Sequence, residues 1–232
     1  MRTVCGFGRK VQAVFERTPV AGEGARPLVT RGVPLLGTEP GDQVRDGVRL
    51  DQVDGTTCGS AVLVALSAWA SADELARLDP AGPDPFVGGI RQGFGARYDA
   101  RQKQVHRETN RLWPQALGTT PWAMVRWLGR NVPGAGRYRV RLVDDSSAQD
   151  VRPLVAEVVA ALATGRPVPL LVGTVVPRHY CLALGVRDDG GWNVYEPTSG
   201  QVRALDPKLI GRRALAPVLG FDHLHAVLLP RG

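Results

Sequence analysis

Between Cys58 and Ala70 the chain reads CGSAVLVALSAWA and carries almost no polar side chain. A helix over this run would be apolar on every face. Such a helix must be enclosed by other elements, because any exposed face would leave apolar surface in contact with water. The sequence therefore predicts a central helix starting at Cys58, with the rest of the domain built around it. Thr56 or Thr57 can cap its start.

Helical and strand-like patterns occupy different parts of the chain. We expect a short helix after Ser71, a basic helix over 100–112, and a helix with Thr120 as N-cap and Pro121 at its first position. After a further helix, expected from Ser147 to about Thr164, the sequence becomes mainly strand-like. The strand-like runs are RYRVRLV (137–143), VPLLVGTVV, HYCLALGV, WNVY and HLHAVLLP. A helical half and a sheet half predict an α+β fold with segregated lobes.

Two regions of different character are expected along the chain. Residues 1–48 contain a short apolar piece followed by Gly-, Pro- and Arg-rich sequence with little periodicity. We expect an irregular N-terminal extension there, which could be a strap, a removable pro-segment or partly disordered chain. Residues 49–232 are expected to form one domain.

Cysteine usage and hydropathy limit the class of protein. The three cysteines, Cys5, Cys58 and Cys181, are too few and too far apart for a disulfide framework, and no CxxC pair indicates zinc. We expect a reducing compartment, no cofactor and no metal. No segment approaches the ~20 apolar residues of a membrane span, and the N-terminus lacks the apolar core of a secretory signal. The expected location is cytoplasmic, with export by a signal-peptide-independent route as the alternative.

Positive charge is concentrated in the middle of the chain. The formal net charge is +7, but residues 91–141 hold eleven basic and two acidic residues, a local charge of +9. This stretch is either a solvated surface or a surface that attracts an acidic peptide or protein. Nucleic acid is a lesser candidate, because no recognised binding motif accompanies the arginines.

The position of Cys58 is typical of a nucleophile. It opens the predicted central helix, where unpaired N–H groups and the helix dipole stabilise a thiolate. Gly55 permits a tight approach to the cysteine, and Gly59 and Ser60 keep the site uncrowded. Gln52, six residues earlier, offers a side-chain donor that could join the Cys58 N–H in holding an oxyanion.

A cysteine nucleophile also needs a base, and the base needs an orienting acceptor. His179 begins a buried strand directly after Pro177 and Arg178. Glu196 ends the next strand beyond a hairpin turn, so it can approach His179 across the sheet. Asn193 is the competing acceptor.

The pattern resembles papain-like cysteine peptidases, and in detail the bacterial C39 and C39-like branch. The residues that carry the resemblance are Gln52 followed by Cys58-Gly59 at a helix start, the run HYCLALGV, and the motif YEPTSG that contains Glu196 and Gly200. The resemblance spans roughly 50–200. It implies a two-lobed fold in which a helical lobe carrying the cysteine packs on an antiparallel sheet carrying the histidine. It implies Cys58 as nucleophile, His179 as base, Glu196 as orienting residue and Gln52 as oxyanion donor. The third member is usually aspartate in this family, and glutamate is one methylene longer.

The expected function is a thiol hydrolase that cleaves an amide or thioester, with peptides or proteins as leading substrates. The alternative is a non-catalytic, C39-like binding module that uses its basic surface to hold an acidic protein or nucleic acid. The sequence does not distinguish proteolysis from deamidation or acyl transfer, and it leaves the oligomeric state open. Of the remaining candidates, Cys181 is expected to be core packing and His106 exposed. His223 and His225 form an HxH pair for which the sequence suggests no carboxylate partner.

Overall fold

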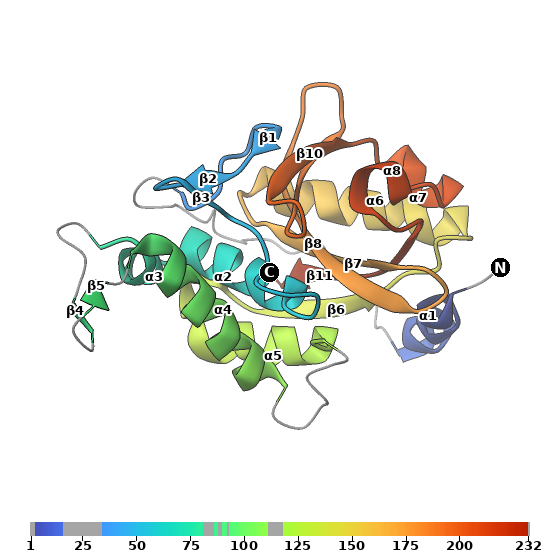
Figure 1. Ribbon diagram of the computed structural model, residues 1–232. Coiled ribbons are helices and arrows are strands. Elements are labelled where there is room, and N and C mark those ends of the chain that lie inside the picture. The colour runs from blue at the N-terminus through green and yellow to red at the C-terminus, as the bar shows by residue number, and fades with distance from the viewer. Residues whose placement is uncertain are drawn as a thin grey trace.

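An antiparallel sheet of seven strands forms the centre of the fold (Figure 1). The strand order is β1-β10-β9-β8-β7-β11-β6. We describe it from a computed structural model, for residues 3–15, 34–80, 86–87, 90–91, 93–110 and 118–231. The strands are β1 (Gly41–Asp42), β6 (Tyr138–Leu142), β7 (Val168–Gly173), β8 (Pro177–Val186), β9 (Trp192–Glu196), β10 (Gln201–Leu205) and β11 (His223–Pro230).

Helices cover both faces of this sheet (Figure 1). Those on one side are α2 (Cys58–Ala70), α3 (Ala72–Leu78), α4 (Phe94–Thr109) and α5 (Pro121–Asn131), followed by a 3-10 turn, η2 (Pro133–Ala135). Those on the other side are α6 (Ala148–Ala163), α7 (Lys208–Arg212) and α8 (Ala216–Leu219), while α1 (Val4–Phe15) lies at the β6 edge. Two small hairpins complete the elements: β2 (Val44–Arg45) with β3 (Val48–Arg49), and β4 (Phe86–Val87) with β5 (Ile90–Arg91).

Alternation along β8 divides the core into two apolar layers. Tyr180, Leu182 and Leu184 belong to the layer that includes α2 and α5. Cys181 and Ala183 belong to the layer that includes α6 and the short helices after β10. The predicted mixed α+β class, with a large antiparallel sheet, is therefore confirmed.

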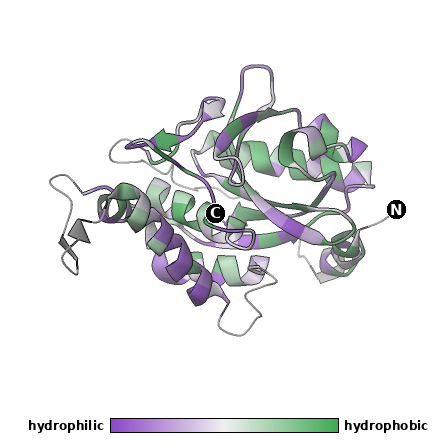
Figure 2. Cartoon of the chain, in the orientation of Figure 1, coloured by the Kyte–Doolittle hydropathy of each residue, from purple (hydrophilic) through white to green (hydrophobic). Residues whose placement is uncertain are grey.

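Helix α2 is enclosed as its apolar sequence predicts. Every side chain from Cys58 to Ala68 is buried. The helix contacts α3, α4, α5 and β8, so it is surrounded by both helices and sheet. Figure 2 shows its apolar colouring beside the hydrophilic surface of α4. This enclosure places the first residue of α2 against the sheet.

Helix starts agree with the sequence at two of the expected caps. The hydroxyl of Ser71 accepts from the Glu74 N–H, and that of Thr120 accepts from the Ala123 N–H, with Pro121 at the first helical position of α5. The basic helix α4 begins at Phe94, earlier than expected, and ends at Thr109. None of the helices in the described residues is both long and apolar enough to cross a membrane.

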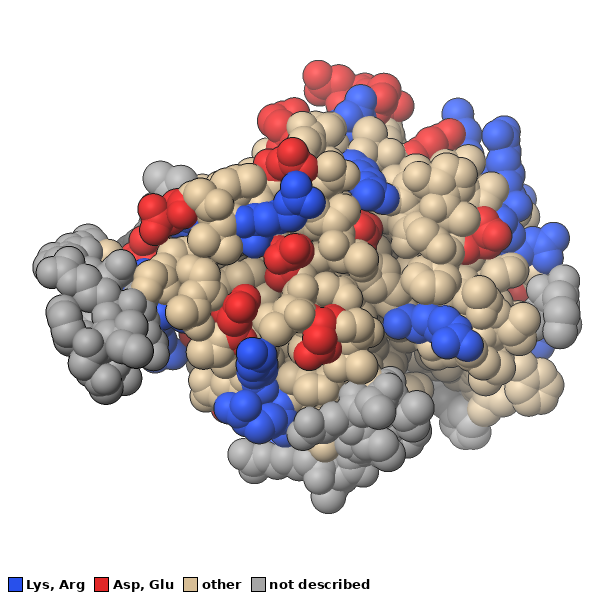
Figure 3. Space-filling view, in the orientation of Figure 1, with Lys and Arg blue, Asp and Glu red and all other residues tan. Residues whose placement is uncertain are grey.

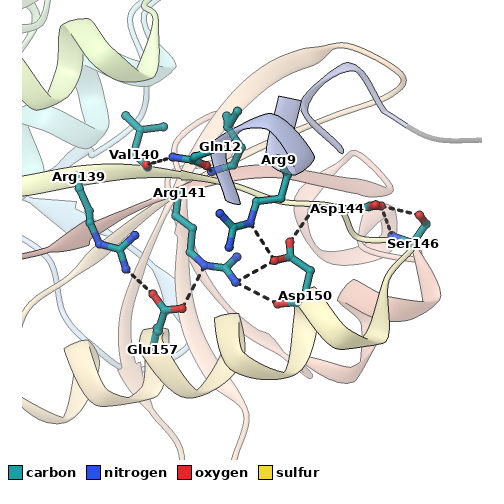
Figure 4. A network of polar contacts seen from close by, with 10 residues as sticks. Arg9, Gln12, Arg139, Val140, Arg141, Asp144, Ser146, Asp150 and Glu157 are labelled. Atoms are coloured by element: carbon teal, nitrogen blue, oxygen red, sulfur yellow. Dashed lines mark hydrogen bonds and ion pairs between the residues drawn. The ribbon is translucent and has the colours of Figure 1, made fainter. Parts of the chain in front are cut away.

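Part of the stretch expected to be irregular is built into the fold. Residues 4–15 form α1, and β1 pairs with β10 at one edge of the sheet. The amide of Gln12 donates to Val140 O at 2.8 Å and accepts from Leu142 N at 2.8 Å, so it bonds the outer edge of β6 (Figure 4). Residues 16–33 of this stretch lie outside the described residues.

Arg141 joins β6, α6 and α1 through a network of charged groups (Figure 4). Its guanidinium is almost fully buried and bonds Asp150 Oδ1 at 3.0 Å and Glu157 Oε1 at 3.1 Å. Asp150 also accepts from Arg9 Nε at 2.9 Å and from the Asp144 N–H. A buried charge of this kind is stable only while its partners remain in place.

We predict that Arg141→Ala lowers the free energy of unfolding by about 3–5 kcal/mol, because it leaves Asp150 and Glu157 without their shared cation. The matched control is Arg187→Ala, which removes an exposed ion pair with Asp189. We expect no measurable change from that control. Urea unfolding of both variants checks the prediction, and equal effects would contradict it.

Candidate active site

The loop before α2 is ordered by Asp54. Its Oδ1 accepts from the Thr56 N–H at 2.8 Å and from the Thr56 hydroxyl at 2.7 Å. The Thr57 hydroxyl also bonds within this loop, to Asp54 N and Asp54 O. Thr57 is the N-cap residue of α2, but its side chain makes no capping bond. The expected side-chain cap is therefore absent, and the first-turn N–H groups keep their capacity to stabilise an anion.

Cys58 is the first residue of α2 and is 6% exposed. It lies close to β8 because the next residue is glycine. A Cβ at position 59 would lie 3.3 Å from both Thr119 Cβ and Tyr180 Cδ2. The Tyr180 hydroxyl donates to Thr119 O at 3.0 Å, which joins β8 to the chain leading into α5.

His179 and Glu196 form a buried pair on neighbouring strands. His179 Nε2 lies 2.8 Å from Glu196 Oε1, and the two residues are 6% and 5% exposed. His179 is near the start of β8 and pairs with Val172 of β7, while Glu196 is the last residue of β9. The predicted hairpin between these strands, closed at 187–191, brings the two side chains together.

The turn after β9 fixes the Glu196 carboxylate. Oε1 accepts from the Thr198 N–H at 2.8 Å, and Oε2 accepts from the Ser199 N–H at 2.9 Å. Gly200 closes the turn at φ +64°, a conformation that side-chain-bearing residues rarely adopt. Burial opposes the charged carboxylate, but the bonds from His179, Ser199 and Thr198 outweigh it and lower the pKa of Glu196 to about 2. Glu196 is thus an anion at neutral pH.

His179 is stabilised in its charged form. Burial alone would lower its pKa. Hydrogen bonds from the ring to the sulfur atoms of Cys181 and Cys58, and to Glu196, outweigh burial and raise the pKa of His179 to about 12. The ring therefore interacts with both the Glu196 carboxylate and the Cys58 thiol at the start of α2.

The structure bonds His179 to Glu196 and not to Asn193, the other candidate acceptor. Asn193 is buried on β9, where it pairs with Gly185 and Ala204. Its Oδ1 has no hydrogen-bond partner among the described residues. The longer glutamate side chain reaches the histidine directly.

Gln52 lies beside the Glu196 turn. Its backbone N–H donates to Pro197 O at 2.8 Å, and its Oε1 lies 3.4 Å from the Thr198 hydroxyl. Its amide nitrogen donates to Asp54 O at 2.8 Å. The loop that carries Gln52 is therefore held to the turn that orients Glu196.

Two buried residues of this region were not predicted from the sequence as parts of the site. Gln102 of α4 donates to Asp51 O at 2.9 Å and accepts from the Val53 N–H at 3.3 Å, so it supports the loop on either side of Gln52. Cys181 was expected to be core packing. It is fully buried, but its sulfur also lies within 4.8 Å of a His179 ring nitrogen. The i, i+2 spacing on a strand was the available signal, because it places both side chains on one face.

The other histidines differ from expectation. His106 is buried, not exposed, and its ring lies 3.2 Å from Asn110 Nδ2. His223 has the carboxylate partner that the sequence did not reveal, with Nδ1 2.8 Å from Asp145 Oδ2. His225 instead bonds Thr174 O, and burial lowers its pKa to about 4.

Comparisons of the sequence with protein-family models and with curated proteins gave no match.

We predict that the His179–Glu196 pair makes stability depend on pH in two windows. The pKa of Glu196 is lowered from 4.5 to about 2, so its contribution is complete above 4.5 and is lost as pH falls toward 2. The pKa of His179 is raised from 6.5 to about 12, so its contribution is complete below 6.5 and is lost as pH rises toward 12. Wild type should therefore be more stable than Glu196→Gln near pH 5–6, and the difference should shrink in both directions. Urea unfolding of both proteins at pH values below, within and above pH 5–6 measures this difference in the free energy of unfolding. A difference that stays constant with pH would refute the pairing.

Proposed function

We propose that this protein is a papain-like, C39-like thiol hydrolase that uses Cys58, His179 and Glu196 as a catalytic triad. The observation that carries the proposal is the arrangement around the His179 ring. Its Nε2 lies 2.8 Å from Glu196 Oε1, and interaction with the Cys58 thiol, at the uncapped start of a buried helix, contributes to the raised pKa of the ring. Nucleophile, base and orienting acceptor therefore follow one another in the order that covalent acyl transfer requires.

The proposed reaction has two halves. The Cys58 thiolate attacks the carbonyl carbon of an amide or thioester, and the bond to the leaving group breaks as His179 gives that group its proton. Water then attacks the resulting thioester while His179 accepts a proton from it, and the acid product leaves Cys58 free. Glu196 stays ionised throughout and holds the ring in place.

The oxyanion formed in each half needs two donors. The backbone N–H of Cys58 is one, because no side chain caps the start of α2. The amide of Gln52 is the other. Its nitrogen already donates to Asp54 O, but an amide NH₂ carries two hydrogens, so one remains for the oxyanion.

Glutamate in place of the usual aspartate is compatible with this role. The added methylene is taken up by the turn that follows Glu196, where the Thr198 and Ser199 N–H groups hold both carboxylate oxygens. The carboxylate therefore stays 2.8 Å from His179 despite its longer side chain.

We expect thiol labelling to test the triad. Cys181 is fully buried, and burial raises the pKa of Cys5 to about 11, so both should react slowly whatever the function. The informative comparison is Cys58 in wild type, Glu196→Gln and His179→Ala. Iodoacetamide at pH 6 should label Cys58 of wild type about 10-fold faster than that of either variant, because only wild type holds an oriented imidazolium beside the thiol.

Peptide mapping by mass spectrometry gives the rate at each cysteine, and circular dichroism confirms that the variants remain folded. Equal Cys58 rates in all three folded proteins would reject the triad and leave the non-catalytic binding module.

Acidic peptides or proteins are the proposed substrates. The basic residues that can attract them are fewer than the net charge of residues 91–141 suggests. Arg101, Arg139 and Arg141 already bond acidic side chains within the fold. The face in Figure 3 shows basic and acidic groups interspersed. The exposed basic residues on α4 and α5, the helices that contact α2, are Lys103, Arg107, Arg126 and Arg130.

The substrate proposal predicts that Arg107→Glu raises KM for an acidic peptide by about 3- to 10-fold at low salt, because attraction becomes repulsion over roughly a Debye length. Arg212→Glu is the matched control, since it reverses an exposed arginine on α7, at the opposite face of the sheet. The effect should fade at high salt and be absent for a neutral peptide. If Arg107→Glu and Arg212→Glu changed KM for the acidic peptide equally, the proposed preference for acidic substrates would be rejected.

A further inference from the structure

Cys181 is a buried sulfur that the proposed reaction does not use. It lies two residues after His179 on β8, on the same face of the strand, and is fully buried. Its sulfur lies within 4.8 Å of a ring nitrogen of His179. The β8–β9 register, in which Leu182 pairs with Tyr195, brings Glu196 beside Cys181 as well.

These three residues offer one nitrogen, one sulfur and one oxygen to a common point. A ligand atom from each of His179, Cys181 and Glu196 lies within 4.8 Å of the other two. A tetrahedral zinc ion with bonds of about 2.0–2.3 Å needs its ligands roughly 3.3–3.8 Å apart. Side-chain rotations would bring the three ligand atoms to this spacing, and they would move His179 Nε2 and Glu196 Oε1 apart from their present 2.8 Å.

The hydrogen bonds and the burial around these three residues are like those usually found around metal ligands. Ligating carboxylates are commonly held by further hydrogen bonds, and Glu196 receives the Thr198 and Ser199 N–H groups. All three residues are buried, which limits competition from water. Three protein ligands with a fourth position left for water is a frequent zinc arrangement.

The geometry points to His179, Cys181 and Glu196 as a binding site for one zinc ion, whose fourth ligand is water. Binding replaces the thiol proton of Cys181 and one ring proton of the His179 imidazolium, and both protons are released to solvent. It also replaces the hydrogen bond between His179 and Glu196, because the ion takes the position between them.

Zinc would consequently hold the proposed hydrolase inactive, and this consequence rests on the proposed function. With zinc on Nε2, the His179 ring could give up its remaining proton only by becoming an imidazolate anion, so it could not deliver the proton that acyl transfer needs. The binding itself does not depend on the reaction, so the two are tested separately.

The experiment titrates Zn²⁺ into the chelator-treated full chain against a chromophoric chelator. We expect one ion per chain in wild type. Cys181→Ala should weaken binding by about 100-fold or more, since loss of a supporting residue alone typically costs 10- to 100-fold. Cys5→Ala removes a thiol on α1 and should bind as wild type does. Cys58→Ala should also retain the site, because Cys58 is not one of the three ligands.

Cobalt substitution gives a second measurement that needs no activity. Wild type and Cys58→Ala should show a thiolate-to-cobalt charge-transfer band that Cys181→Ala lacks. Unfolding curves establish that Cys181→Ala is folded. Loss of binding in Cys58→Ala with retention in Cys181→Ala would overturn the site, and so would equal affinity in wild type and folded Cys181→Ala. Rapid labelling of Cys58 without zinc binding would reject the metal site alone, while zinc binding with slow labelling would reject the hydrolase alone.

Discussion

The enclosure of α2 is the constraint on which the rest of the structure depends. A helix with apolar residues on all sides gains its stability only by contact with other elements around it. Here α3, α4 and α5 cover one part of its surface and β8 covers another. Because the helix cannot shift without exposing apolar surface, its first residue is held beside the strand that carries His179. The position of Cys58 thus follows from burial, before any polar contact is considered.

Polar contacts then fix the segments around that residue. The Tyr195 hydroxyl donates to Leu50 O at 2.6 Å, and Gln52 N donates to Pro197 O at 2.8 Å. Both bonds join the loop before α2 to the end of β9. The turn after Glu196 therefore makes two sets of bonds. The Thr198 and Ser199 N–H groups orient the carboxylate, and the Pro197 carbonyl binds the loop that carries Gln52. A change in the turn would disturb both at once.

The sequence revealed the elements whose signals are local. The apolar run of α2, the Thr120-Pro121 start of α5 and the strand carrying His179 all follow from periodicity and capping. The pairing of His179 with Glu196 was accessible because a short hairpin sets the register between their strands. The proximity of Gln102 to the Gln52 loop could not be predicted from the sequence, since it depends on how α4 packs against α2. The same applies to His223, whose partner Asp145 lies 78 residues away. Contacts across such separations depend on tertiary packing, which a single sequence does not specify.

Strand order also bears on how the chain can fold as it is synthesised. β11, residues 223–230, lies between β7 and β6, so β6 has no place in the sheet until β11 has emerged. Helix α1 bonds β6 through Gln12, across 128 and 130 residues. Helix α1 is synthesised early, but it can dock only after β11 has been synthesised and has brought β6 into the sheet. Such late closure lowers folding rates and prolongs the exposure of unpaired edges. On the ribosome, the face of α1 that carries Gln12 would spend this interval without the edge of β6 that it bonds in the folded protein.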